Sequence, residues 1–96
     1  MGHIDKKENK QVRDKVENYR VEGKIDGFLA QIETEYLKAR AKFGDFKSPH
    51  EGYAVIFEEL DELWDLVKEN QGRSVKTREE CIQIAAMAMA YYLELS

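Results

Sequence analysis

Residues 57–65 read FEELDELWD, and five of these nine residues are acids. The apolar residues in and just after this stretch recur at steps of three and four, which is the spacing of an amphipathic α-helix. They are Phe57, Leu60, Leu63, Trp64 and Val67. We therefore expect a helix that packs this apolar stripe, Trp64 included, into the core and carries a dense set of carboxylates beside it.

The beginning of this helix is marked in the sequence. Ser48 is suited to the N-cap, Pro49 to the first helical position, and Glu51 follows Ser48 by three residues. Together they form a capping box with the favoured proline. The helix is expected to run to about Asn70, with Gly72 beyond its end.

An earlier helix is predicted from about Gly27 to Phe43, with Asp26 as its N-cap and Gly44 as a left-handed residue that ends it. A further helix is predicted to begin near Thr77 and to run to about residue 94. No segment alternates in the manner of a β-strand. The predicted fold class is all-α, with three to four helices per chain.

The last predicted helix is apolar on nearly every side between residues 81 and 93, and we expect Cys81 within it to be a small buried residue. Two other amphipathic helices offer one stripe each, so the sequence predicts that a second copy of the chain completes the core. Alternatively, the N-terminal segment folds back over the apolar surface of the last helix through Val12, Val16 and Tyr19.

Residues 1–25 are polar and mixed in charge, and we expect a partly disordered start or a short helix there, before an all-α domain over residues 26–96. The net charge of −4 makes broad binding to nucleic acid polymers an unlikely function. The longest apolar run, residues 84–93, is too short to span a bilayer, and residues 1–10 lack a signal-peptide core. A cytoplasmic location without membrane partners is the expectation.

Carboxylates crowd one side of the acidic helix. Glu58 and Glu62 lie one turn apart, Glu59 precedes Glu62 by three residues, and the only base near this cluster is Lys68. Like charges at this spacing repel each other, and a hard cation with oxygen ligands, such as Mg²⁺, would relieve the repulsion.

Glu80 and Gln83 lie three residues apart near the start of the last helix and share a face. If the last two helices pack antiparallel, Glu80 approaches Glu59 or Glu62 and can join a cation site. The alternative is that Glu80 completes a capping box with Thr77, and that Gln83 is a buried amide bonded to the backbone.

The pattern Glu58-Glu59-x-x-Glu62, then 17 residues, then Glu80-x-x-Gln83 resembles the E-E-x-x-E…E-x-x-D signature of MazG-type nucleotide pyrophosphohydrolases. The resemblance extends from about residue 28 to residue 95. It implies an all-α homodimer or tetramer that uses Mg²⁺, with Mn²⁺ as the alternative ion. Its substrates would be nucleoside triphosphates, cleaved to a monophosphate and pyrophosphate.

The same resemblance implies roles for single residues. Glu59, Glu62 and Glu80 correspond to metal ligands, and Glu58 to a ligand or to the residue that orients the attacking water, which makes Glu58 and Glu59 the catalytic candidates. Gln83 stands where the family has an aspartate, and its amide oxygen can coordinate Mg²⁺ only without charge.

Four bases are candidates for holding the phosphates of a substrate. They are Lys42, Lys68, Arg73 and Lys76. The alternative for each of them is a solvent-exposed side chain without a binding role. The competing function is a non-catalytic helical interaction module that keeps the scaffold, and the amide at Gln83 favours that alternative.

Overall fold

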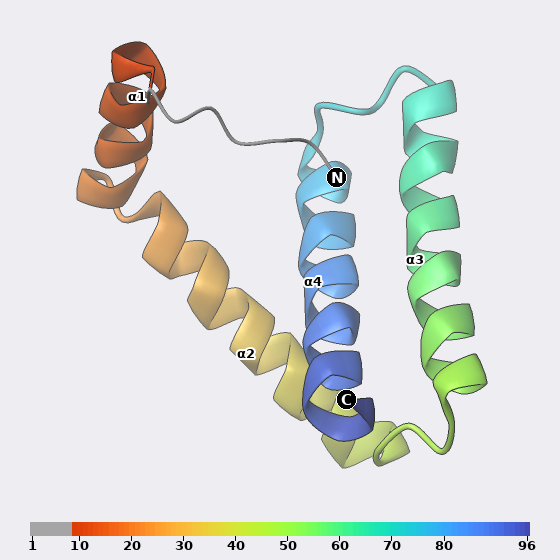
Figure 1. Cartoon of the computed structure of the whole chain (residues 1–96). Coiled ribbons are helices and arrows are strands. Elements are labelled where there is room, and N and C mark those ends of the chain that lie inside the picture. Colours follow the sequence, from red (N-terminus) through yellow and green to blue (C-terminus); the bar gives the residue numbers. More distant parts are fainter. Residues whose placement is uncertain (1–8) are drawn as a thin grey trace.

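The computed structural model describes residues 9–96 as four α-helices and no strand (Figure 1). The helices are α1 (Lys10–Val21), α2 (Lys24–Phe43), α3 (Pro49–Lys68) and α4 (Val75–Leu95). The all-α prediction is thus confirmed for the described part of the chain, and the polar N-terminal segment contributes a helix of its own.

Helix α4 is the centre of the fold. It lies between α2 and α3, and α3 runs antiparallel to it along its whole length (Figure 1). Helix α2 contacts α4 mainly through its C-terminal half and diverges from it toward its own beginning, while α1 contacts only α2. Within residues 9–96, no Cα atom of α2 lies within 8 Å of one in α3, so α4 holds the two helices together.

The core is small and is built around α4. Ala86 and Ala90 are completely buried, and Met87 and Ile32 are nearly so. Apolar residues of α2, of the α2–α3 connection and of α3 pack against this centre, namely Tyr36, Ala39, Phe46, Val55 and Ile56. Ala86 and Ala90 are buried within the single chain, so these two residues do not depend on a second copy, and completion of the rest of the core by a second copy stays a prediction.

Helices α3 and α4 pack closely at Gly52, which is buried. A Cβ atom at this position would lie 2.7 Å from Cδ2 of Tyr91 and 2.9 Å from Cδ1 of Leu95. Any side chain there would push the two helices apart.

The ends of α3 follow from local chemistry. Ser48 accepts a hydrogen bond from the Glu51 amide with Pro49 in the first turn, as predicted, but the Glu51 carboxylate accepts from the Lys47 amide instead of completing the box at Ser48. The helix ends at Lys68, two residues before the predicted end. Asn70 adopts a left-handed φ of 61° in place of a glycine, which closes a Schellman cap.

Two predicted helix starts are wrong by a few residues. Helix α2 begins at Lys24, because Gly23 turns the chain out of α1 with a left-handed φ of 76°, and Asp26 lies inside the first turn. Helix α4 begins at Val75, because Ser74 and not Thr77 is the N-cap.

The apolar stripe predicted to face the core on α3 mostly faces away from it. Trp64 is 55% exposed, and Phe57, Leu60 and Val67 are similarly open. The core face of α3 is the neighbouring one, through Gly52, Val55 and Ile56. Helix α3 therefore has two apolar faces, and no element within residues 9–96 covers the one with the larger side chains.

Candidate metal centre

Three carboxylates meet where α3 and α4 run side by side. Glu59 and Glu62 come from α3 and Glu80 from the second turn of α4, and one oxygen of each lies within 4.8 Å of the others. The antiparallel arrangement brings them together, because the start of α4 is opposite the later half of α3. Glu59 and Glu80 are half-buried and Glu62 is exposed, so the cluster opens to solvent on one side.

Glu80 is not used by the helix cap. Ser74 and Thr77 form a reciprocal capping box between themselves, with the Thr77 amide donating to the Ser74 hydroxyl and the Ser74 amide to the Thr77 hydroxyl. The alternative in which Glu80 caps the helix with Thr77 is therefore wrong. Oε2 of Glu80 is buried and accepts no hydrogen bond within residues 9–96.

The surroundings of these acids favour their protonated forms. Burial raises the pKa of Glu59 from 4.5 to about 7, with further contributions from the negative charge of Glu62 and from a hydrogen bond with Glu80. Burial also raises the pKa of Glu80, and its closeness to Glu62 adds to the effect. A hydrogen bond between two carboxyl groups needs a shared proton, so the cluster retains protons that isolated glutamates lose.

No basic side chain in the described part of the chain forms a salt bridge with the cluster. Among residues 9–96, the salt bridges of Lys and Arg all go to other acids, and none reaches Glu59, Glu62 or Glu80. A buried carboxylate oxygen without a donor is costly unless it is protonated or meets a cation. The three oxygens fit a hard divalent cation, since such ions take carboxylate ligands and reverse the local charge.

A hollow of about 320 Å³ opens beside the cluster. Its lining includes Glu62 and Glu80 together with Lys76, so Lys76 is the predicted base that the structure brings to the site. Glu79 and Leu66 also line it, and the charge of Glu79 adds to the raised pKa of Glu80. Sequence reasoning gave Glu79 no role, although its position directly before Glu80 was a signal.

The other predicted bases lie elsewhere. Lys68 pairs with Asp65 at 3.3 Å and lies over the Trp64 ring. Arg73 lines a separate hollow at the α3–α4 turn. Lys42, in the last turn of α2, lies at the opposite end of the molecule from that turn (Figure 1).

Glu58 and Gln83 are near the cluster in sequence but are not joined to it. Glu58 is exposed on α3 and is not among the three converging carboxylates. Gln83 is half-buried one turn after Glu80, and within residues 9–96 its amide makes no hydrogen bond. An amide without a protein partner remains available as a neutral oxygen donor.

A second polar cluster lies at the other end of α4. Glu94 accepts hydrogen bonds from the Arg40 guanidinium at 2.8 Å, the Tyr36 hydroxyl at 3.0 Å and the Phe46 amide at 2.9 Å. Arg40 also donates to the Gly44 carbonyl at 2.7 Å. These contacts tie the α2–α3 connection to the last turn of α4, so this cluster has a structural role.

Comparison with known protein families, with characterised proteins and with solved structures gave no match. None of the described helices combines the length and the hydropathy that a membrane crossing requires.

Proposed function

We propose that this protein is a Mg²⁺-dependent nucleotide pyrophosphohydrolase that cleaves nucleoside triphosphates to a monophosphate and pyrophosphate, with Mn²⁺ as an alternative ion. The observation that carries the proposal is the meeting of Glu59, Glu62 and Glu80 within 4.8 Å, without any basic partner in the described chain. The resemblance of their spacing to the MazG signature supports the reaction.

Each residue of the cluster has a defined task in this proposal. Glu59, Glu62 and Glu80 hold the ion, and the amide oxygen of Gln83 is a neutral fourth donor from the next turn of α4. A bound Mg²⁺ would neutralise charge on the phosphate oxygens and lower the pKa of a coordinated water. Glu58, exposed beside Glu59, orients the attacking water.

Lys76 is the base best placed to hold the outgoing phosphates, since it lines the hollow that also contains Glu62 and Glu80. Arg73 and Lys68 flank the same turn and are less close to the cluster in the single chain. Lys42 could contribute only to a site formed with another copy. We propose a homodimer or tetramer in the cytoplasm as the working unit, because many large apolar side chains are exposed in the isolated chain.

The test is a panel of nucleoside triphosphates incubated with protein and Mg²⁺, with pyrophosphate and monophosphate measured as products. We expect pyrophosphate release that stops when the metal is chelated and falls at least about 100-fold in Glu59→Gln and Glu62→Gln. Glu33→Gln, an exposed acid on α2, is the matched control and should keep full activity.

The alternative function is a non-catalytic helical interaction module on the same scaffold. Two observations favour it, the amide at Gln83 in place of a charged ligand and the extent of exposed apolar surface. In that case Mg²⁺ would still stabilise the fold but no nucleotide in the panel would be cleaved. Stabilisation without turnover would therefore replace the enzymatic proposal by this one.

A further inference from the structure

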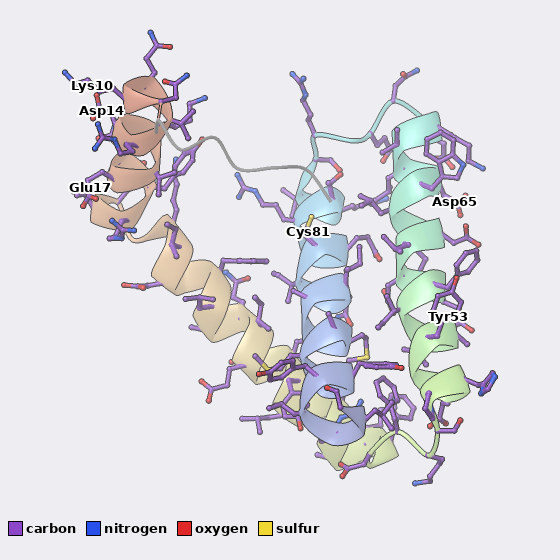
Figure 2. All side chains as sticks on the ribbon, viewed as in Figure 1. Lys10, Asp14, Glu17, Tyr53, Asp65 and Cys81 are labelled. Carbon is purple, nitrogen blue, oxygen red and sulfur yellow. The ribbon has the colours of Figure 1, made fainter. Side chains whose placement is uncertain are left out.

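Helix α3 presents a continuous apolar surface to solvent, which we call the outer stripe. It consists of Tyr53, Phe57, Leu60, Trp64 and Val67, each between 44% and 66% exposed. Tyr53 lies on the side of α3 that faces away from α4, as does the acid Asp65 that follows Trp64 (Figure 2). An apolar patch of this size on a soluble protein usually marks an interface.

A second surface that contains apolar side chains lies on the other side of α4 from α3, where α2 and α4 diverge. We call this hollow of about 500 Å³ the α2–α4 groove. Its lining includes the apolar residues Phe28 and Ile82 and the bases Lys24 and Arg78. Cys81, which was predicted to be buried, also lines it and is exposed.

Helix α1 lies next to the Lys24 end of the α2–α4 groove. The Lys24 ammonium, which lines the groove, lies 5.6 Å above the Tyr19 ring. Lys10, Asp14 and Glu17 point away from the rest of the molecule (Figure 2). Helical spacing puts Tyr19 on the other side of α1, in one apolar stripe with Val12 and Val16, whose side chains are exposed.

The two surfaces have opposite charge. Helix α3 carries six acids and one lysine, and two of these acids, Asp61 and Asp65, border the outer stripe. Helix α1 carries four bases and two acids, of which Lys10, Asp14 and Glu17 lie on its far side. The groove lining adds Arg78 and also Lys24, which is paired with Glu22 at 3.1 Å. Pairing two α3 helices would bring like charges together, which disfavours a homotypic α3–α3 contact.

We propose that the outer stripe of α3 in one copy of the chain binds in the α2–α4 groove and against α1 of a second copy. Because both surfaces are present on every chain, a two-fold axis makes the contact twice and buries both in each subunit. The acids beside the stripe then face the bases of α1 and of the groove. This specifies the contact within the oligomer included in the proposed function, and it requires neither metal nor nucleotide.

The only tryptophan of the chain, Trp64, reports on this contact. We expect a dimer mass by light scattering at tens of micromolar protein, and a Trp64 emission maximum that moves to longer wavelength on dilution as the ring becomes exposed. Val16→Glu, on the apolar stripe of α1, should raise the dimer Kd at least about 30-fold. Its Trp64 emission should then match that of the diluted protein.

The matched control is Val21→Glu, the same substitution on the same helix at a residue that is 78% exposed and off the stripe. It should leave mass and emission unchanged, and helical circular dichroism should confirm that both variants are folded. A monomeric wild type would overturn the proposal. So would a dimer that Val16→Glu does not weaken, because that result would indicate an α3–α3 contact.

A mixing experiment tests which surfaces meet. Phe57→Glu damages the outer stripe but leaves α1 and the groove intact, whereas Val16→Glu does the reverse. Each variant alone should be monomeric, and their mixture should regain a dimer through one intact contact, with Trp64 of the Val16→Glu chain shifting to shorter wavelength. Failure of the mixture to associate while both variants are folded would contradict the proposed pairing.

Discussion

The two polar clusters of α4 contain the same functional group in opposite circumstances. At one end Glu94 is only 6% exposed in its side chain and is surrounded by donors from Arg40, Tyr36 and Phe46. At the other end Glu80 meets two more carboxylates, and one of its buried oxygens has no donor within the described chain. In the first cluster both oxygens of Glu94 have donors and its charge is balanced, and only Nε of Arg40 is buried without a partner within residues 9–96, whereas the carboxylates of the second cluster require protons or a cation.

The comparison shows why burial alone does not identify a functional acid. Glu94 is the more deeply buried of the two, but its charge is balanced and its oxygens are hydrogen-bonded, so it serves the fold. Glu59 and Glu80 are less buried and have raised pKa values, because burial and neighbouring acids act in the same direction. Uncompensated charge in a solvent-accessible hollow is the feature that indicates a binding site.

The largest effect should come from breaking the balanced cluster. Glu94→Gln removes the negative partner of a buried Arg40, and we expect the free energy of unfolding to fall by about 3–5 kcal/mol. Urea unfolding followed by circular dichroism measures it. Glu17→Gln, which removes an exposed pair with Arg20, is the control and should change stability by less than about 1 kcal/mol.

Glutamate-to-glutamine substitutions in the three-carboxylate cluster should change the stabilisation of the fold by Mg²⁺. Millimolar Mg²⁺, if about 100 times its Kd, should stabilise the wild type by about 2.7 kcal/mol, which raises Tm by roughly 10 °C or more. Glu59→Gln and Glu62→Gln should abolish most of that rise. Without metal they should not lower Tm, since each removes a repulsive charge. A wild-type melting curve that Mg²⁺ leaves unchanged would disprove the cation site.

The next largest effect should be a pH dependence of stability that comes from Glu59 in the three-carboxylate cluster. The pKa of Glu59 is about 7 in the folded chain, above the ordinary value of 4.5, so the folded state binds the proton more tightly than the unfolded state. Its contribution to stability is therefore complete below about pH 4.5, declines as pH rises, and is lost above about pH 7.

The difference in Tm between wild type and Glu59→Gln, measured in a chelator across this range, isolates that contribution. The wild type should lose a few degrees relative to the variant between pH 5 and pH 8, and Mg²⁺ should remove the loss by binding the deprotonated carboxylates. Parallel curves for the two proteins would show that Glu59 titrates at its ordinary pKa.

The smallest expected effect concerns Gln83. If its amide faces the ion, Gln83→Asp adds a charged ligand and should tighten Mg²⁺ binding by about tenfold, an effect of about 1.4 kcal/mol that titration calorimetry can resolve. Gln83→Leu keeps a similar volume without an oxygen and should weaken binding. Weaker binding together with a marked loss of stability in Gln83→Asp would indicate a core amide and exclude the residue from the site.

Much of the fold could be predicted because it depends on local chemistry. Proline and serine at the start of α3 and Gly44 at the end of α2 fix helix ends by their own conformational limits and hydrogen bonds. The predicted helix ends were wrong where more than one residue could serve as the cap. Ser74 competed with Thr77 for the N-cap of α4, and Asn70 took the left-handed position expected of a glycine.

The candidate site was predictable in part for the same reason. Spacing of three residues places Glu59 and Glu62 on one side of a helix in any fold, so their mutual repulsion is a property of the sequence. Their approach to Glu80 depends on the antiparallel packing of α3 against α4. The same packing buries the Glu80 oxygen that has no hydrogen-bond donor among residues 9–96. Lys76 could be separated from the other bases only by the hollow it shares with Glu80.

The helical character of the chain, the ends of most helices and the unbalanced negative charge of α3 can be read from the amino-acid sequence, because they depend on contacts within a few residues. Which apolar face of α3 is buried cannot, because it depends on the packing of α3 against α4. Both faces have helical periodicity, and the close approach allowed by Gly52 selects the face with small side chains. The stripe with Phe57 and Trp64 stays outside because its large side chains cannot pack at that distance from α4.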